Sequence, residues 1–142
     1  MALIREEIAQ QLRGEFAKLV NPVRLAVFSQ ALVDPGSEDV KRLVEEVAAL
    51  DPRITVEAFN FVLDTEKVEA LAIKRTPAIA FLGDGRDYGV RFYGLPSNYE
   101  FKTLIDGILD VSSGQSGLSE ETRAALAELK TPVHLQVFST PT

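Results

Sequence analysis

The chain has 142 residues, of which 46% are hydrophobic and 25% charged, the composition of one globular domain with at most a piece of a second. Acidic residues outnumber basic ones by 21 to 15, so the net charge is −6, and we expect neither nucleic acid nor an anionic membrane as a partner. No cysteine is present, which excludes thiol chemistry, iron–sulfur clusters and cysteine zinc sites. With His134 as its single histidine, the chain is expected to hold no metal and no cofactor.

Targeting signals are absent from the sequence as given. Charged residues interrupt the apolar ones throughout the first twenty positions, so no signal peptide is predicted. No apolar run reaches the roughly 18 residues that cross a bilayer. Lack of cysteine is compatible with a reducing compartment. We therefore expect a soluble protein in the cytoplasm.

The first elements in chain order are a helix and a strand. Apolar residues recur at helical spacing at Ile4, Ile8, Leu12, Phe16 and Leu19. Asn21-Pro22 ends this helix, because the residue before a proline is pushed out of the helical region. The mostly apolar run over residues 23–28 predicts a strand buried on both faces.

A second helix and strand follow the turn-forming cluster Asp34-Pro35-Gly36-Ser37. Ser37 is predicted to be the N-cap of this helix. The residues expected to form its apolar face are Val40, Leu43, Val44 and Val47. After the break at Asp51-Pro52, residues 54–59 alternate as a strand does, and Asp64 or Thr65 opens a short third helix.

Thr76-Pro77 introduces a hairpin and another helix. Residues 78–82 are continuously apolar, and residues 88–93 are expected to pair with them across a loop longer than two residues. Gly83-Asp84-Gly85 lies in that turn and lacks the helix that a phosphate-binding loop would open. The next amphipathic helix carries Phe101, Leu104, Ile105, Ile108 and Leu109.

The end of the chain repeats its beginning. A small polar stretch over residues 114–118 is typical of a linker, and Ser119 is the expected N-cap of a last helix. Residues 132–138 (PVHLQVF) match residues 22–28 (PVRLAVF) at five of seven positions, and both follow an amphipathic helix. This internal repeat predicts that a second copy of the same unit begins here, so residues 133–138 are expected to form a strand.

The order of these elements, with Thr76-Pro77 before the third strand, is that of the thioredoxin-like fold. The run GVRFYGLPSNYEF over residues 89–101 resembles the signature of the glutaredoxin-like protein disulfide oxidoreductases, which join two thioredoxin-fold units in tandem. Other segments similar to landmarks of that family are Asn21-Pro22-Val23, Leu43-Val44-Glu45-Glu46 and Val137-Phe138-Ser139-Thr140-Pro141-Thr142. A more distant likeness is to the paired thioredoxin folds at the N-terminus of the alkyl hydroperoxide reductase flavoprotein subunit.

The resemblance implies an α/β fold with a mixed four-stranded sheet flanked by helices. It covers the whole chain and divides it into a thioredoxin-like unit over residues 1–113, a linker over 114–118 and the first helix and strand of an incomplete second unit over 119–142. The family's Cys-x-x-Cys positions in the first unit hold Asp34 and Ser37 here, and the second motif would begin directly after Thr142. We therefore expect a truncated chain without catalytic residues.

Asp34 is expected to serve as a turn residue and helix start, the alternative being a relic active site with anion or acid chemistry. Thr76 and Pro77 form a weaker candidate site. In active thioredoxin folds the residue before the cis-proline offers its backbone to an extended peptide, whereas the simpler interpretation is that Pro77 only shapes the turn. His134 is expected to be satisfied locally, without a metal ligand's role.

Other polar residues have structural interpretations. Alternation is expected to place Arg91 and Tyr93 on one face of their strand, while Gly94 and Pro96 turn the chain. The signature residues Arg91, Tyr93, Tyr99 and Glu100 are therefore not expected to carry chemistry. Adjacent acidic pairs, Glu45-Glu46 and Glu120-Glu121, are interpreted as solvated helix faces.

The sequence thus predicts a redox-inactive N-terminal unit of a protein disulfide oxidoreductase. Its expected role is to support thiol–disulfide exchange carried by the second unit, in the setting of cell redox homeostasis, while this chain alone is not an enzyme. The alternative is a cysteine-free binding or adaptor module that recognises an extended peptide or a partner chain. Expected partners are the second thioredoxin-fold unit or, in a homo-oligomer, another copy, because the strand over residues 133–138 lacks the rest of its sheet.

Overall fold

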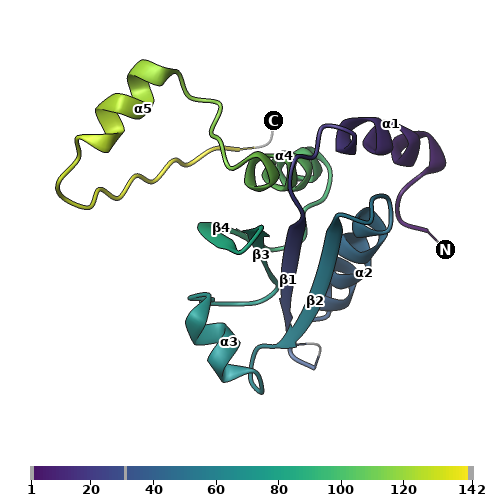
Figure 1. Cartoon of the computed structure of the whole chain (residues 1–142). Helices are drawn as coiled ribbons and strands as arrows, with labels where there is room; N and C mark the ends of the chain where they lie inside the picture. Colours follow the sequence, from purple (N-terminus) through teal and green to yellow (C-terminus); the bar gives the residue numbers. More distant parts are fainter. Residues whose placement is uncertain (1, 31, 141–142) are drawn as a thin grey trace.

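A four-stranded mixed sheet forms the centre of the molecule (Figure 1). The computed structural model describes residues 2–30 and 32–140. The strands are β1 (Val23–Ser29), β2 (Ile54–Asn60), β3 (Ala78–Gly83) and β4 (Arg86–Tyr93), in the spatial order β2-β1-β3-β4. β1 runs parallel to β2, and β3 runs antiparallel to both β1 and β4. The expected thioredoxin-like α/β fold is confirmed.

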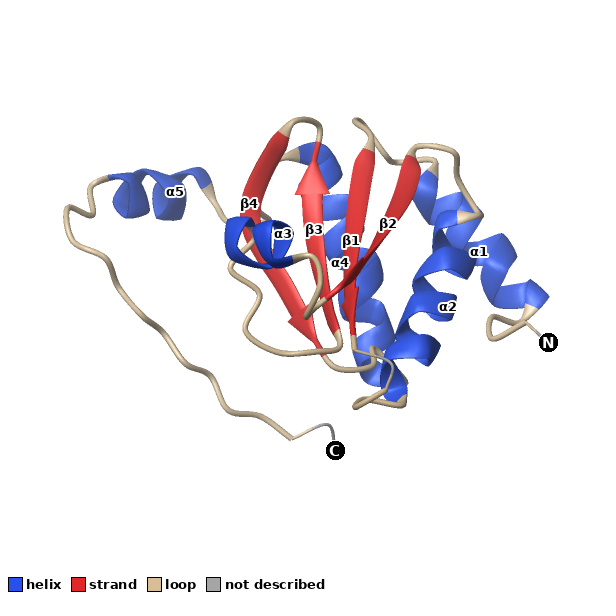
Figure 2. Ribbon diagram, turned by 90° about the horizontal axis from the view of Figure 1, so that it is seen from below, coloured by secondary structure: helices blue, strands red, loops and turns tan. Residues whose placement is uncertain are grey.

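The two faces of the sheet are covered unequally (Figure 2). Helices α1 (Glu6–Phe16), α2 (Gly36–Ala48) and α4 (Tyr99–Ser113) lie on one face, and the short α3 (Thr65–Ala70) lies on the other. The predicted apolar face of α2 is buried at Val40, Leu43, Val44 and Val47. Within the described ranges, no helix is both long and apolar enough to cross a membrane.

The larger core fills the space between the sheet and three helices. Its fully buried large side chains include Phe16, Leu25, Ile79, Phe81, Leu104 and Ile108. On the α3 face, Phe28 stacks on Phe59 with ring centroids 5.2 Å apart, and a smaller cluster gathers around them. Burial of these apolar surfaces is the main term that stabilises the fold.

The hairpin differs from the prediction. β4 begins at Arg86, so Asp84 and Gly85 alone form the connection, and the expectation of a longer loop is wrong. Phe81 pairs with Val90 whereas Leu82 pairs with Asp87, so two extra residues of β4 form a bulge that includes Gly89 at a φ of +81°. The hydrophobic pattern did not predict this part of β4, because the side chains at the start of this exposed edge strand are polar.

The C-terminal segment forms its helix without its strand. Helix α5 (Glu120–Ala127) has its predicted N-cap at Ser119, whose Oγ accepts the Thr122 N–H at 3.2 Å. Residues 133–138 form no strand, contrary to expectation, and their side chains are exposed, Phe138 by 89%. A strand needs a neighbour to complete its hydrogen bonds, and this segment lies apart from the sheet (Figure 2). Residues 141–142 of the predicted second unit lie outside the described residues.

Two polar anchors join segments that lie far apart in the chain. Ser112, at 1% exposure, accepts the N–H groups of Val20 and Asn21 at 3.0 and 3.1 Å and donates to the Asn21 carbonyl at 2.7 Å. Arg53 donates to the carbonyl oxygens of Phe16 and Leu19, both at 2.8 Å, at the end of α1. These bonds fix the turn between α1 and β1 against both α4 and β2.

Candidate functional site

The residues expected at the site lie at one end of the sheet. β1 ends at Ser29 and leads into the turn before α2, while β3 starts at Ala78, directly after Thr76-Pro77. Phe28 pairs with Ala78 across the antiparallel ladder, so the turn that holds Asp34 and the Thr76-Pro77 segment leave the sheet side by side. The Gly94 N–H donates to the Pro77 carbonyl at 2.9 Å, so the last residue of β4 lies at this same end of the sheet.

Asp34 holds the start of α2 through its side chain. Its Oδ1 accepts the Gly36 N–H at 3.1 Å, and its backbone carbonyl accepts the Ser37 N–H at 3.1 Å. The other carboxylate oxygen, Oδ2, is buried and has no hydrogen-bond partner among the described residues. Asp34 therefore organises a helix terminus, where a carboxylate is favoured by the helix dipole.

Ser37 differs from its predicted role. Helix α2 begins one residue earlier, at Gly36, with Pro35 in the N-cap position, so Ser37 is not the N-cap. Because Asp34 already satisfies the first free N–H group, Ser37 is drawn into the first turn and is fully buried. Its Oγ accepts the Gln30 N–H at 3.3 Å. Among the described residues, this hydroxyl donates no hydrogen bond to a general base that would activate it as a nucleophile.

The peptide bond between Thr76 and Pro77 is cis, and both residues are half-buried. Exposed apolar side chains flank this edge in two loops: Leu32, Val33, Val62 and Leu63, with exposures from 55% to 102%. The two loops leave the sheet together, since Ser29 pairs with Asn60 and the Phe61 N–H donates to the Ser29 carbonyl at 2.9 Å.

The signature residues of β4 have structural partners. Arg91 donates to the Asp87 carboxylate at 2.6 and 2.9 Å and to the Leu71 carbonyl at 2.9 Å, which ties β4 to the end of α3. The hydrogen bond from Arg91 lowers the pKa of Asp87. Tyr93 lies under the Arg75 guanidinium, 4.3 Å from the ring centroid. Both side chains are thus engaged in contacts within the fold.

Three further residues considered in the sequence analysis are exposed to solvent. Tyr99 is 77% exposed, and Glu100 and His134 are exposed as well. Among the described residues, no group of three or more His, Cys, Asp or Glu side chains is placed to hold a metal ion. Because the sequence has no cysteine, the chain lacks a thiol active site.

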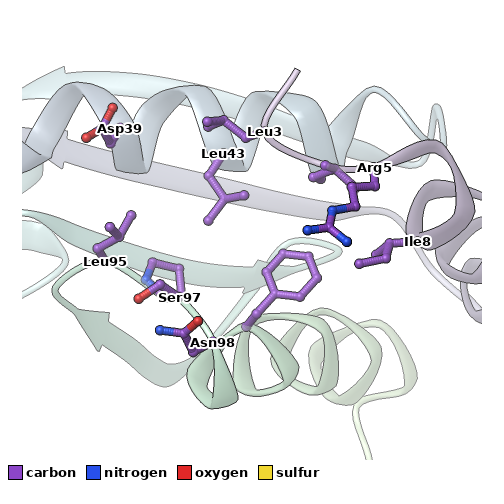
Figure 3. A pocket seen from close by; sticks show the side chains of 11 residues that line it. Leu3, Arg5, Ile8, Asp39, Leu43, Leu95, Ser97 and Asn98 are labelled. Atoms are coloured by element: carbon purple, nitrogen blue, oxygen red, sulfur yellow. The ribbon is translucent and has the colours of Figure 1, made fainter. Parts of the chain in front are cut away.

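A separate pocket of about 520 Å³ lies between α1, α2 and the segment that leads into α4. Its lining residues are Leu3, Ile4, Arg5, Ile8, Asp39, Leu43, Leu95, Pro96, Ser97, Asn98 and Phe101 (Figure 3). Sequence analysis missed this pocket because three segments far apart in the chain build it. The sequence held no signal for it, since Ile8 continues the apolar stripe of α1 and only the structure shows that it is 40% exposed on the pocket wall.

Glu46 fixes one wall of this pocket. Its carboxylate accepts the Leu3 N–H at 2.8 and 2.9 Å and the Ile4 N–H at 2.9 Å. Burial raises the pKa of Glu46, but the hydrogen bonds from Leu3 and Ile4 outweigh it, and the pKa is lowered overall. The interpretation of Glu46 as part of a solvated helix face is therefore wrong, because its carboxylate is held by backbone N–H groups from the start of the chain.

Comparison with known proteins gives relatives with redox names. No protein-family model matches the chain. A protein named NADH dehydrogenase from Ferdinandcohnia aciditolerans is 33% identical over 110 residues, which are 78% of this chain and 18% of that protein. The N-terminal domain of alkylhydroperoxide reductase AhpF from Enterococcus faecalis is 30% identical with a TM-score of 0.77, and the match covers 85% of this chain and 58% of that one.

A protein disulfide oxidoreductase from Aeropyrum pernix is 29% identical with a TM-score of 0.78, covering 89% of this chain and 55% of the other. Both likenesses drawn from the sequence are confirmed, and in identity and TM-score the two are equally close. The chain spans about a fifth of the curated relative and a little over half of the two solved chains. It is a thioredoxin-like domain similar to domains of redox proteins.

Proposed function

We propose that this chain is a redox-silent thioredoxin-fold unit of a longer protein. In this proposal it supports, orients or shields a second thioredoxin-fold unit that carries thiol–disulfide exchange. The observation behind it is the pair Asp34 and Ser37, which stand at the start of α2 where the resemblance places two cysteines. Neither a carboxylate nor a buried hydroxyl attacks a disulfide, which requires a thiolate.

The internal repeat supports the second unit. Residues 132–138 repeat the sequence of β1, which lies in the middle of a sheet, yet their own side chains are exposed. Leu135 and Val137 are exposed by 85% and 89%, which favours a partner surface that covers them. The second unit of the same protein supplies that surface in this proposal, or another copy of the chain does. The longer protein would be a thiol–disulfide oxidoreductase.

An insulin-reduction assay tests the silence of this unit. With dithiothreitol as the electron source, insulin reduction in the presence of the wild-type chain is expected to be no faster than with dithiothreitol alone. The double variant Asp34→Cys/Ser37→Cys places two thiols at a helix N-terminus, which lowers a thiol pKa, and is expected to accelerate the reaction. The single variant Ser37→Cys is the matched control, because it cannot form the internal disulfide. Turnover by the wild-type chain, or none by the folded double variant, contradicts the proposal.

The supporting role has its own test in the natural protein. Its mass and coding sequence are expected to extend past Thr142 into a Cys-x-x-Cys motif, and its insulin reduction is expected to depend on that motif alone. A natural protein without cysteine after residue 142 contradicts this role.

A second candidate function is the binding of an extended peptide at the Thr76-Pro77 edge. The observation that favours it is the group of exposed apolar side chains in the two flanking loops, at Leu32, Val33, Val62 and Leu63. Titration of the ¹⁵N-labelled chain with reduced insulin B chain is expected to shift resonances at residues 75–79. Pro77→Ala is the control that should remove the shifts, and unchanged resonances in the wild-type chain count against peptide binding.

A further inference from the structure

The pocket between α1, α2 and the start of α4 carries an inference that is independent of the thioredoxin-like edge. Its walls are largely apolar: Leu3, Ile8 and Leu95 line it and keep 46%, 40% and 38% of their surface exposed. Its volume of about 520 Å³ falls in the range of small-molecule sites, roughly 300 to 1,000 Å³.

One of the residues that line this pocket, Arg5, carries a positive charge. Figure 3 shows the guanidinium of Arg5 reaching from the beginning of α1 into the pocket, while Asp39 lies at the far end. Among the described residues, the Arg5 side chain has no ion pair or hydrogen bond. An arginine without a protein carboxylate presents several donors in a fork that suits a carboxylate from a ligand.

The opposite wall adds polar groups and a positive helix end. Ser97 and Asn98 lie across the pocket from Arg5 in Figure 3, and the 15-residue helix α4 begins at the next residue. Asn98 has a φ of +52°, an uncommon value for a residue other than glycine, and its side chain does not cap the helix. The amide is therefore left facing the pocket, beside a helix N-terminus that favours negative charge.

The arginine is held in a defined place. Leu3 and Ile4, which precede it, donate their N–H groups to the Glu46 carboxylate on α2. The Arg5 carbonyl accepts the Ala9 N–H at 2.9 Å in the first turn of α1. The backbone on both sides of the Arg5 side chain is thus bonded before any ligand arrives, which lowers the entropic cost of binding.

We propose that this pocket binds a small organic carboxylate with an apolar body. The apolar part lies against Leu43, Leu95 and Phe101, and the carboxylate pairs with Arg5. Asp39 repels a second negative charge at the far end, so a monoanion fits better than a dianion.

Titration of the ¹⁵N-labelled chain with octanoate at pH 7 tests the proposal. Saturable shifts are expected at residues 3–8, 39–43 and 95–101. Neutral 1-octanol, which has the same chain length, is expected to bind about ten-fold more weakly or worse, because it lacks the charge-assisted bond.

Arg5→Gln keeps most of the side-chain length without the charge and is expected to weaken octanoate binding about ten-fold or more. Arg13→Gln is the matched control, since Arg13 lies on the same helix but pairs with Glu6 outside the pocket, and it should bind octanoate as the wild type does. Equal binding of octanol and octanoate, equal binding by the Arg5 variant, or shifts confined to residues 133–138 would overturn the proposal.

Discussion

The backbone N–H of Leu3 donates to both carboxylate oxygens of Glu46, at 2.9 and 2.8 Å, although 43 residues separate them in the chain. Helix α1 has no side-chain cap of its own, since Arg5 occupies the N-cap position without such a bond. A carboxylate on α2 therefore holds the segment that leads into α1, through N–H groups that precede the helix.

Glu46→Gln is expected to lower the free energy of unfolding by about 1 to 2 kcal/mol, because a charged acceptor of backbone N–H groups becomes neutral. Urea unfolding at neutral pH measures the change. Glu45→Gln is the matched control: Glu45 is exposed and pairs with Lys41 at 4.0 Å, so it should cost less than about 0.5 kcal/mol. Equal stability of the two variants would show that the bonds to Leu3 and Ile4 contribute nothing.

The effect of Glu46 depends on pH in a definite direction. Its pKa in the folded chain lies below the usual 4.5, so its stabilisation is complete above that value and is lost as the pH falls through the folded pKa. The difference in unfolding free energy between wild type and Glu46→Gln is expected to stay constant from pH 7 to about 5 and to shrink in more acidic solution. A difference that grows on acidification contradicts this assignment.

Ser112→Ala is expected to destabilise the chain by about 2 to 4 kcal/mol, because it removes one donor and one shared acceptor from a buried contact. The N–H groups of Val20 and Asn21 and the Asn21 carbonyl would all lose a partner. The neighbouring Ser113 is exposed, so Ser113→Ala should change stability by no more than about 0.5 kcal/mol. The urea concentrations at which the two variants are half unfolded measure the difference in stability. Similar midpoints would refute the anchoring role of Ser112.

The pair of Asp51 and Arg53 makes stability at the end of α1 sensitive to acid. The hydrogen bond from the Arg53 side chain lowers the pKa of Asp51 below its usual 3.8, so the stability it provides is present above that pH and is lost as the pH falls through the folded pKa. Asp51→Asn is expected to cost about 1 kcal/mol at pH 7 and less in acid. The control Asp106→Asn removes an exposed pair with Lys102, and its small effect on the free energy of unfolding should be the same at every pH tested. Urea unfolding between pH 2 and pH 7 decides, and a cost independent of pH counts against the pairing.

Strands β1, β2 and β3 and the buried face of α2 could be predicted because each depends on a local sequence pattern. Val40, Leu43, Val44 and Val47 recur at helical spacing, and all four are buried. The start of β4 could not be predicted, because Arg86 and Asp87 belong to an edge strand whose exposed side chains carry no apolar signal. Ser37 was misplaced for a related reason, since two residues in the same turn can cap a helix and the sequence does not say which one does.

In the candidate site, too, local sequence predicts some residues, and only the folded chain identifies the others. Asp34 and Thr76-Pro77 were found from turn chemistry and from order along the chain, and the register of Phe28 with Ala78 brings them to one edge. The sequence predicted that Glu46 lies on a solvated helix face, and it did not single out Ser112. Their partners lie 43 and 91 residues away, so only the folded chain identifies them as anchors.

Two helical glycines are expected to respond to alanine with opposite signs. In α4, a Cβ at Gly107 would lie 2.9 Å from Cε1 of Phe81, a ring that is 1% exposed and cannot easily move. Gly107→Ala is therefore expected to destabilise by about 1 to 3 kcal/mol, because overpacking outweighs the better helix propensity of alanine. In α1, a Cβ at Gly14 meets nothing within 4 Å, so Gly14→Ala should stabilise by about 0.5 to 1 kcal/mol. Urea unfolding of both variants measures the signs. A stabilising Gly107→Ala would mean that α4 does not press on the Phe81 ring, and the packing of α4 on β3 would have to be redrawn.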